Sequence, residues 1–171
     1  MKKFGILFIV LVGIATTSFG QVGANANANA SATIVGSLTI AKTVDMKFGQ
    51  MTSPTAPETV VLTPASGISG TGTIALIAGS PVSAAGYNVS GTQGATYAIT
   101  VPLDGVVTLA GAGTPMDVST FTTSKPGNVS TLGVAVAGVN DAFTVGATLH
   151  VAAGQAQGVY TGTFNVAIAY N

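Results

Sequence analysis

The stretch "GVYTGTFNVAIAYN", Gly158 to Asn171, decides the fold class. Aromatic and aliphatic residues occupy every second position, and small or polar residues lie between them. Because side chains point alternately to the two faces of a β-strand, the pattern predicts a half-buried strand from Val159 to Tyr170. We expect this strand to be docked along its length, since an undocked apolar edge would aggregate. Gly158 begins the stretch, Gly162 interrupts its apolar face, and that face comprises Tyr160, Phe164, Val166, Ile168 and Tyr170.

Further strand candidates follow at short intervals, each bounded by Gly, Pro, Ser or Asn. No window of helical length has apolar residues at helical spacing without Gly or Thr interrupting it. The sequence therefore predicts an all-β fold, a single antiparallel Ig-like β-sandwich. The earlier predicted strands are Thr33–Ala41, Val44–Phe48, Thr59–Leu62, Thr73–Ala78, Gly86–Ser90, Thr96–Pro102, Val106–Ala110, Met116–Thr122, Val129–Val136 and Phe143–Val151.

Several short segments have the composition of turns and loops. "LDGVV" at Leu103–Val107 is Asp-Gly between two β-rich runs and predicts a hairpin. "SKPGN" at Ser124–Asn128 places Pro and Gly as a type II turn requires. The two prolines of Thr52–Glu58 predict a loop, because a central strand would not tolerate them. "GISGTG" at Gly67–Gly72 lacks the Lys and the helix of a phosphate-binding loop and predicts a flexible connection.

The first twenty residues have the pattern of a secretion signal. Lys2 and Lys3 precede an apolar run from Phe4 to Ala15, and the small residues Ser18 and Gly20 suit a signal peptidase. We expect cleavage near Gly20, so residues 1–20 are a predicted signal peptide. The run is too short for a stable anchor, and no transmembrane anchor is expected in the mature chain. The protein is therefore expected in the periplasm, on the cell surface or outside the cell.

The charge and cysteine content exclude several classes of function. Only 6% of the 171 residues are charged, although 47% are hydrophobic, and the chain has no cysteine. The predicted mature chain has three lysines and five acidic residues, a balance of 3 − 5 = −2, and no arginine. Such a chain would not attract a nucleic-acid backbone. The absence of cysteine excludes thiol catalysis and thiolate metal sites.

Residues 21–31 form an Ala/Asn-rich N-terminal extension, ahead of a sandwich domain predicted at 32–171. Its low complexity is typical of a linker. An alternative is a thin edge strand from Val22 to Lys42, because the apolar residues there share one parity. Such a strand could lie in a shallow groove of its own domain or of a neighbour.

The sequence offers no catalytic, cofactor-binding or metal site. His150 is the only histidine and is expected on the outer face of a strand, so a zinc site has too few ligands. No nucleophile-elbow pattern occurs, and the carboxylates are scattered singly. Tyr87, Tyr97 and Phe121 could stack on sugars if exposed, but their spacing is more typical of a core. We expect no cofactor and no enzymatic activity.

Four segments together resemble a bacterial family of secreted domains, domain of unknown function 4402. They are "ATIVGSLTIAKTVDMKFG" at Ala32–Gly49, "TVVLTP" at Thr59–Pro64, "ATYAITVP" at Ala95–Pro102 and "QAQGVYTGTFNVAIAYN" at Gln155–Asn171. Their order and spacing both agree with the family. The resemblance implies a secreted β-domain and brings no known activity.

The C-terminal strand is also similar to that of chaperone–usher pilins and spore-coat-U-type proteins. Those end in an alternating strand with a penultimate aromatic, here Tyr170, and a glycine near its start, here Gly158. "VDMKFGQMTS" at Val44–Ser53 looks like their early strand. The similarity implies gripping by a periplasmic chaperone and completion of the sandwich by a neighbour's N-terminal extension, both through β-augmentation. Pilins of this type usually contain a disulfide, which this chain cannot form.

Two functions remain open at this point. The first is a non-enzymatic structural or interaction module of the bacterial surface, a pilus- or coat-like subunit with protein partners. For this function the candidate assembly residues are Gly158, Tyr160, Phe164, Val166, Ile168 and Tyr170. The alternative is an adhesin-type module that binds a ligand or glycan through loops.

Overall fold

The computed structural model describes residues 23–132 and 140–171. The predicted signal peptide, residues 1–20, lies outside them, as does the second half, residues 133–136, of the strand predicted at Val129–Val136. The chain divides into two units, Met1–Thr33 and Ile34–Asn171. In the first unit, residues 23–33 are all exposed and form no strand. Within the described ranges, no helix is long and apolar enough to cross a membrane.

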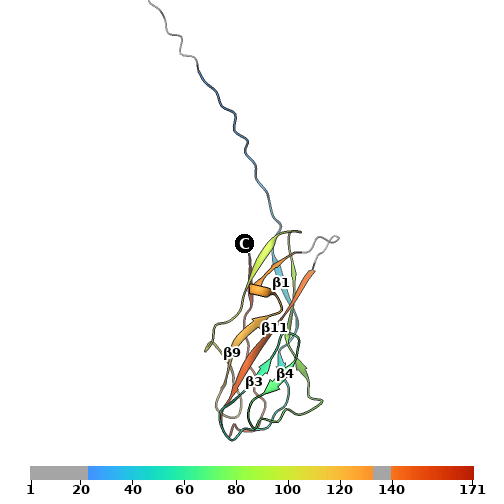
Figure 1. The fold of residues 1–171 in the computed structure, drawn as a ribbon, viewed down its shortest axis with the longest axis vertical. Helices are drawn as coiled ribbons and strands as arrows, with labels where there is room; N and C mark the ends of the chain where they lie inside the picture. The colour runs from blue at the N-terminus through green and yellow to red at the C-terminus, as the bar shows by residue number, and fades with distance from the viewer. Residues whose placement is uncertain (1–22, 133–139) are drawn as a thin grey trace, which may run out of the picture. The chain divides into compact units, whose positions relative to one another are not determined.

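The second unit is an antiparallel β-sandwich, which confirms the predicted all-β fold (Figure 1). Short strands alternate with Gly-, Pro- and Ser-containing turns, as the sequence predicts. The strands are β1 Thr39–Val44, β2 Lys47–Phe48, β3 Glu58–Leu62, β4 Ile68–Gly70, β5 Val82–Ser83, β6 Ala85–Ser90, β7 Thr96–Thr100, β8 Val107–Leu109, β9 Met116–Thr123, β10 Val129–Thr131, β11 Asn140–Val151 and β12 Ala167–Tyr170, with a 3-10 turn, η1, at Pro126–Asn128.

The larger sheet is built around β11, its longest strand (Figure 1). The first half of β11 pairs with β6 and the second half with β3, while β9 pairs with its middle. Val145 thus lies opposite Ala85 of β6 and Thr123 of β9, and Leu149 lies opposite Val60 and Val118. Strands β1, β4 and β8 extend this sheet at its margins.

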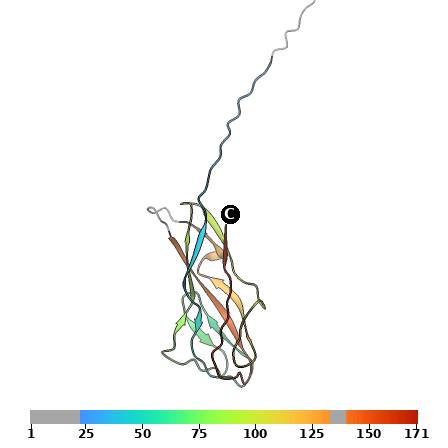
Figure 2. The same cartoon turned by 180° about the vertical axis from the view of Figure 1, so that it is seen from behind.

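A smaller sheet has the order β10-β7-β12, and β2 pairs separately with β5. In the smaller sheet, Tyr170 lies opposite Tyr97 and Ala167 opposite Thr100. Strand β12 is therefore an edge strand, with β7 on one side only. Figure 2 shows the C-terminal segment, in dark red, running along the domain to the C-terminus.

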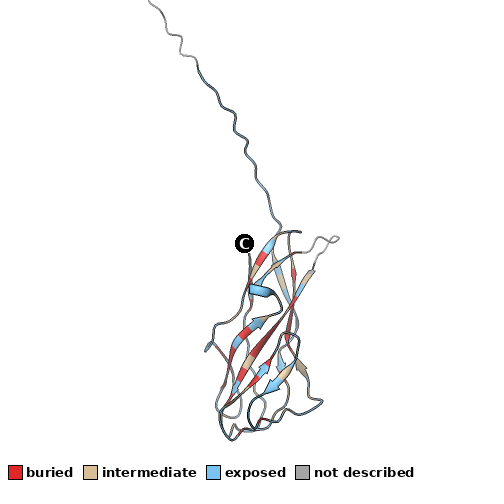
Figure 3. Cartoon of the chain, in the orientation of Figure 1, coloured by how far each residue is buried: buried red, intermediate tan, exposed pale blue. Residues whose placement is uncertain are grey.

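The core lies between the sheets and is made of the inward faces of their strands. Buried residues follow β11 along most of its length (Figure 3). Tyr87 and Phe143 stack with ring centroids 5.2 Å apart, and Phe121 meets Phe164 at the same distance. Tyr97 is fully buried. The prediction that Tyr87, Tyr97 and Phe121 are core residues is confirmed, and none of them is free to stack on a sugar.

Two predictions about turns and loops are wrong. Asp104 and Gly105 do form a turn, but β7 and β8 on either side of it belong to different sheets, so it is no hairpin. The Asp104 carboxylate instead accepts a 2.6 Å hydrogen bond from the Thr120 amide. Gly67–Gly72, predicted as a flexible loop, contains β4, which pairs with β3.

The segment predicted as a strand at Thr73–Ala78 forms only an isolated bridge, between Leu76 and Met51. The amides of Thr73 and Ile74 donate to the Glu58 carboxylate at 2.7 and 2.8 Å instead of to a neighbouring strand. Those hydrogen bonds, with that from the Thr73 amide the strongest, lower the pKa of Glu58. The start of the segment is therefore a turn held by a carboxylate, and its middle bonds to Gln50 and Thr52.

Other turn predictions are confirmed. Pro126 and Gly127 lie within a turn closed by the Asn128 amide, which donates to the Lys125 carbonyl at 3.1 Å. Gly127 has φ 62° and ψ 16°, the left-handed conformation that a type II turn requires at this position. The residues between Thr52 and Glu58 form no strand, as their prolines predict.

Candidate functional site: a groove beside the C-terminal segment

In the C-terminal segment, buried and exposed side chains alternate as the sequence predicts, but the segment does not pair with another strand along its whole length. Its even-numbered large residues are buried or half-buried, and Val159, Thr163 and Asn165 are exposed. The strand predicted from Val159 to Tyr170 is wrong in extent, because only Ala167–Tyr170 is a strand, with a separate bridge between Thr161 and Ala110. The alternating burial arises from docking onto the core rather than from pairing along the whole segment.

The backbone–backbone hydrogen bonds that the described structure gives this segment outside β12 are made by odd-numbered residues. The Thr161 amide donates to the Ala110 carbonyl and the Asn171 amide to the Thr96 carbonyl, at 2.9 and 3.1 Å. Backbone groups alternate between the two edges of an extended chain, so odd-numbered residues face β7 and β8, and even-numbered residues face the opposite edge. Within the described structure, residues 162–166 form no backbone–backbone hydrogen bond.

A second extended segment, Lys42–Ser53, faces this free edge across a groove. On its far side it is bonded into the domain: β2 pairs with β5, and the Ile77 amide donates to the Gln50 carbonyl at 2.9 Å. On its near side it lines the groove together with Gln155–Phe164. The groove thus has two walls of extended chain.

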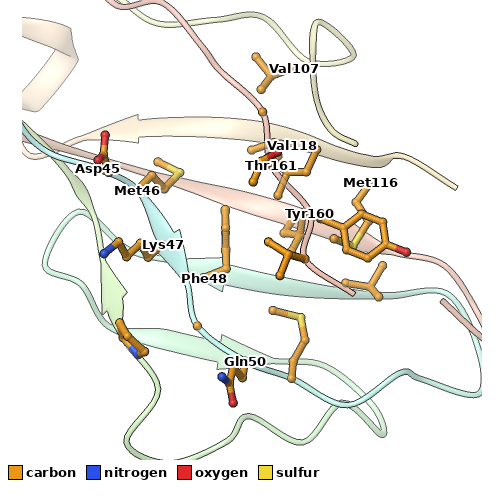
Figure 4. Close-up of a pocket in the computed structure, with 18 of the residues that line it drawn as sticks. Asp45, Met46, Lys47, Phe48, Gln50, Val107, Met116, Val118, Tyr160 and Thr161 are labelled. Carbon is orange, nitrogen blue, oxygen red and sulfur yellow. The ribbon is translucent and has the colours of Figure 1, made fainter. Parts of the chain in front are cut away.

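The groove has a volume of about 780 Å³ and a mainly apolar lining. Its walls contribute Met46, Phe48 and Tyr160, which surround one space with Met116 from β9 (Figure 4). Core residues form the remainder of the lining: Ala85, Tyr87, Val107, Leu109, Val118, Leu149 and Val151. Apart from half-buried Leu109, these residues are at most 8% exposed, so the floor of the groove is the packed core itself.

Two polar features mark the groove. The Gln155 side chain donates to the Thr114 carbonyl at 2.7 Å, while its Oε1 is buried with no hydrogen-bond partner among the described residues. Lys42, Asp45 and Lys47 also line the groove. Asp45 is hydrogen-bonded to Lys42, which lowers the pKa of the Asp45 carboxyl. A buried acceptor without a donor is costly, so Gln155 favours an occupant that supplies an N–H or O–H group.

The family model described as Domain of unknown function (DUF4402) matches residues 38–170. The chain belongs to the DUF4402 family. No curated protein and no solved structure matches the chain significantly. Both walls of the groove lie inside the DUF4402 region, whereas the Ala/Asn-rich extension precedes it.

The DUF4402 domain divides the six predicted assembly residues into two groups. Gly158, Tyr160 and Phe164 line the groove. Tyr160 also donates to the Ala156 carbonyl at 2.9 Å, and Phe164 packs on Phe121. The other three, Val166, Ile168 and Tyr170, pack against the hydrophobic core and do not line the groove.

Sequence reasoning missed the opposite wall as part of the site. Met46, Phe48 and Met51 were not singled out as site residues, yet they line the groove. The sequence did contain a signal for Met46 and Phe48. Together with Val44 they occupy alternate positions, as the apolar face of a strand requires.

The DUF4402 domain has one Ser–His contact. Ser119 Oγ lies 2.7 Å from His150 Nε2, with Ser119 buried and His150 exposed on the outer face, as predicted. In the described residues no carboxylate hydrogen-bonds to His150, and no three His, Cys, Asp or Glu side chains form a group that could hold a metal ion. The contact satisfies the buried serine hydroxyl.

Proposed function

We propose that this DUF4402 protein is a non-enzymatic, exported structural or interaction module of the bacterial surface that assembles by β-strand complementation. The groove is the observation that supports this proposal. One wall has a backbone edge, from Gly162 to Phe164, with no backbone–backbone hydrogen bond among the described residues, and core residues line the floor. An extended strand laid between the walls would bond to that edge and cover the floor.

The physical gain from such docking is large enough to support assembly. Each large apolar side chain that a docked strand buries contributes about 1.5–3 kcal/mol. The backbone amides of Gly162 and Phe164, which lie at the free edge, would gain carbonyl partners. A donor from the strand would also satisfy Gln155 Oε1.

The N-terminal extension of a second copy, residues 21–31, is the proposed donor strand. Its described residues are exposed and form no strand. Their alternating alanines share one parity with Ile34, whose side chain is 95% exposed. A chain of such contacts gives a pilus- or coat-like polymer. A periplasmic chaperone that grips the subunit by β-augmentation would use the same groove.

Deletion of Gln21–Ala30 tests the donor. The shortened chain should fold as a monomer and self-associate more weakly than the mature protein, as measured by analytical ultracentrifugation. Unchanged sedimentation of the shortened chain would refute the donor-strand mechanism.

A pair of groove variants tests the acceptor edge. Phe164→Ala and Phe164→Pro both remove the aromatic ring, but only the proline removes the amide at the free edge. That amide has no backbone partner among the described residues, so the two variants should have similar stability. Self-association should be much weaker in Phe164→Pro than in Phe164→Ala. Equal self-association would refute strand addition at this edge.

Glycan binding is the competing function, and the burial of Tyr87, Tyr97 and Phe121 removes the aromatic residues that the sequence offered for it. A glycan array with the mature protein separates the two proposals. Specific glycan binding by a protein that stays monomeric would favour the adhesin-type function.

A further inference from the structure

The methionines of this protein are concentrated at the groove. The chain has four methionines, and Met1 belongs to the predicted signal peptide. The other three, Met46, Met51 and Met116, all line the groove. Met46 and Met51 are half-buried in one wall, whereas Met116 is only 8% exposed. Small molecules that enter the groove therefore have better access to Met46 and Met51 than to Met116.

The chemistry of these side chains differs from that of the rest of the lining. Thioethers are the most readily oxidised groups in a chain without cysteine. Oxidation turns a flexible apolar side chain into a polar one and disrupts methionine-rich contact surfaces. Among the groove residues, Phe48 and Val107 offer the new oxygen no hydrogen bond, and the Tyr160 hydroxyl already donates to the Ala156 carbonyl.

We propose that Met46 and Met51 form an oxidation site at which a peroxide-class oxidant blocks docking in the groove. The thioether sulfur attacks one peroxide oxygen, an S–O bond forms and the O–O bond breaks. Sulfur loses two electrons, and the departing hydroxide takes the proton of the oxygen now bound to sulfur and leaves as water when the oxidant is hydrogen peroxide. The product is methionine sulfoxide, which methionine sulfoxide reductases convert back to methionine.

The effect on docking follows from desolvation and rests on the proposed function. A docked strand would cover the two sulfoxides and remove water from their S–O groups without replacing its hydrogen bonds. The strand should therefore bind at least about tenfold more weakly to the oxidised groove. Because sulfoxide formation is reversible, assembly should return after reduction.

The experiment uses the mature chain treated with hydrogen peroxide, peptide mass mapping and analytical ultracentrifugation. Met46 and Met51 should each gain one oxygen, about 16 Da, before Met116 does. Self-association should weaken at least about tenfold and recover after treatment with sulfoxide reductases. The Met46→Leu/Met51→Leu variant is the matched control, since leucine has a similar volume and is not oxidised. Because both residues line the groove, the untreated sample of this variant is its reference, and peroxide should not change its self-association relative to that sample.

The results separate the two proposals. If untreated protein does not self-associate, the proposed function fails, and with it the effect of oxidation on assembly. If untreated protein self-associates and the oxidised protein does so equally well, the oxidation site fails and the proposed function stands. Peroxide-induced loss in the double leucine variant, or oxidation of Met116 as early as Met46 and Met51, also overturns the proposal.

Discussion

The phenol of Tyr97 in β7 donates a 2.7 Å hydrogen bond to the Asp141 carboxylate in β11, which joins the smaller sheet to the larger one. Ser130 and Lys125 donate to the same carboxylate, each at 2.6 Å. The Lys125 and Asp141 side chains are only 22% and 16% exposed. Burial alone would raise the pKa of Asp141, but the three donors outweigh it and lower that pKa.

Asp141→Asn should destabilise the domain by about 1–3 kcal/mol, because an amide cannot accept from three donors and leaves the Lys125 charge unpaired. Urea denaturation at neutral pH measures the change. Asp45→Asn is the control, since the Lys42–Asp45 pair is mostly exposed and its loss should lower stability much less than the loss of Asp141. Equal effects of the two substitutions would contradict a cross-sheet role for Asp141.

Acid should weaken the folded protein through the same carboxylate. The pKa of Asp141 is lowered from its ordinary 3.8 in the folded state, so the unfolded chain binds a proton at higher pH than the folded one. Its stabilising contribution is present above about pH 4 and is lost as pH falls through the folded pKa. The denaturation midpoints of the wild type and Asp141→Asn should converge as the pH falls below the pKa of Asp141 in the folded state. A constant difference down to pH 2 would rule out this linkage.

Tyr170→Phe should lower stability by about 1 kcal/mol or more. The Tyr170 hydroxyl accepts from the Thr92 amide at 2.8 Å and donates to the Gly36 carbonyl at 3.0 Å, so it connects β12 to two loops. Phenylalanine keeps the ring and removes both hydrogen bonds. Thermal unfolding measures the change, and an unaltered midpoint would show that these bonds add nothing to stability. Tyr160→Phe, which loses one exposed bond to the Ala156 carbonyl, is the matched control.

The sequence predicted local patterns well and non-local pairings poorly. Alternation placed Phe164, Val166 and Ile168 on one face, because side-chain direction depends only on the local extended backbone. It could not show that residues 162–166 have no strand partner in the described part of the chain, since pairing depends on where β7 and β8 end. The Asp104–Gly105 turn was recognisable in the same way, but not the Thr120 amide that anchors it. That contact spans sixteen positions.

The sequence indicated only one of the two walls of the groove, because the contact between the walls is also non-local. The C-terminal wall has a clear period of two, but a groove exists only where a second wall stands opposite. Met46 and Tyr160 line the same space although they are far apart in the chain. No spacing rule relates them. Burial of Gln155 Oε1 likewise depends on its neighbours in the folded chain rather than on its own identity.

Gly162 interrupts the apolar row of the C-terminal segment, and the structure gives a physical reason. A Cβ atom at this position would lie 2.3 Å from the Thr108 carbonyl oxygen, a backbone atom that cannot move aside easily. Gly162→Ala should therefore destabilise the domain by about 1–3 kcal/mol by pushing the segment away from β8.

Chemical denaturation measures the loss of stability in Gly162→Ala. Amide exchange at Thr161, whose amide bonds to Ala110, shows whether the segment has moved. Gly23→Ala is the control, because no atom lies within 4 Å of its added methyl group and its stability should not change. Wild-type stability and exchange in Gly162→Ala would show that the close approach to Thr108 is not needed, and that another constraint breaks the apolar row.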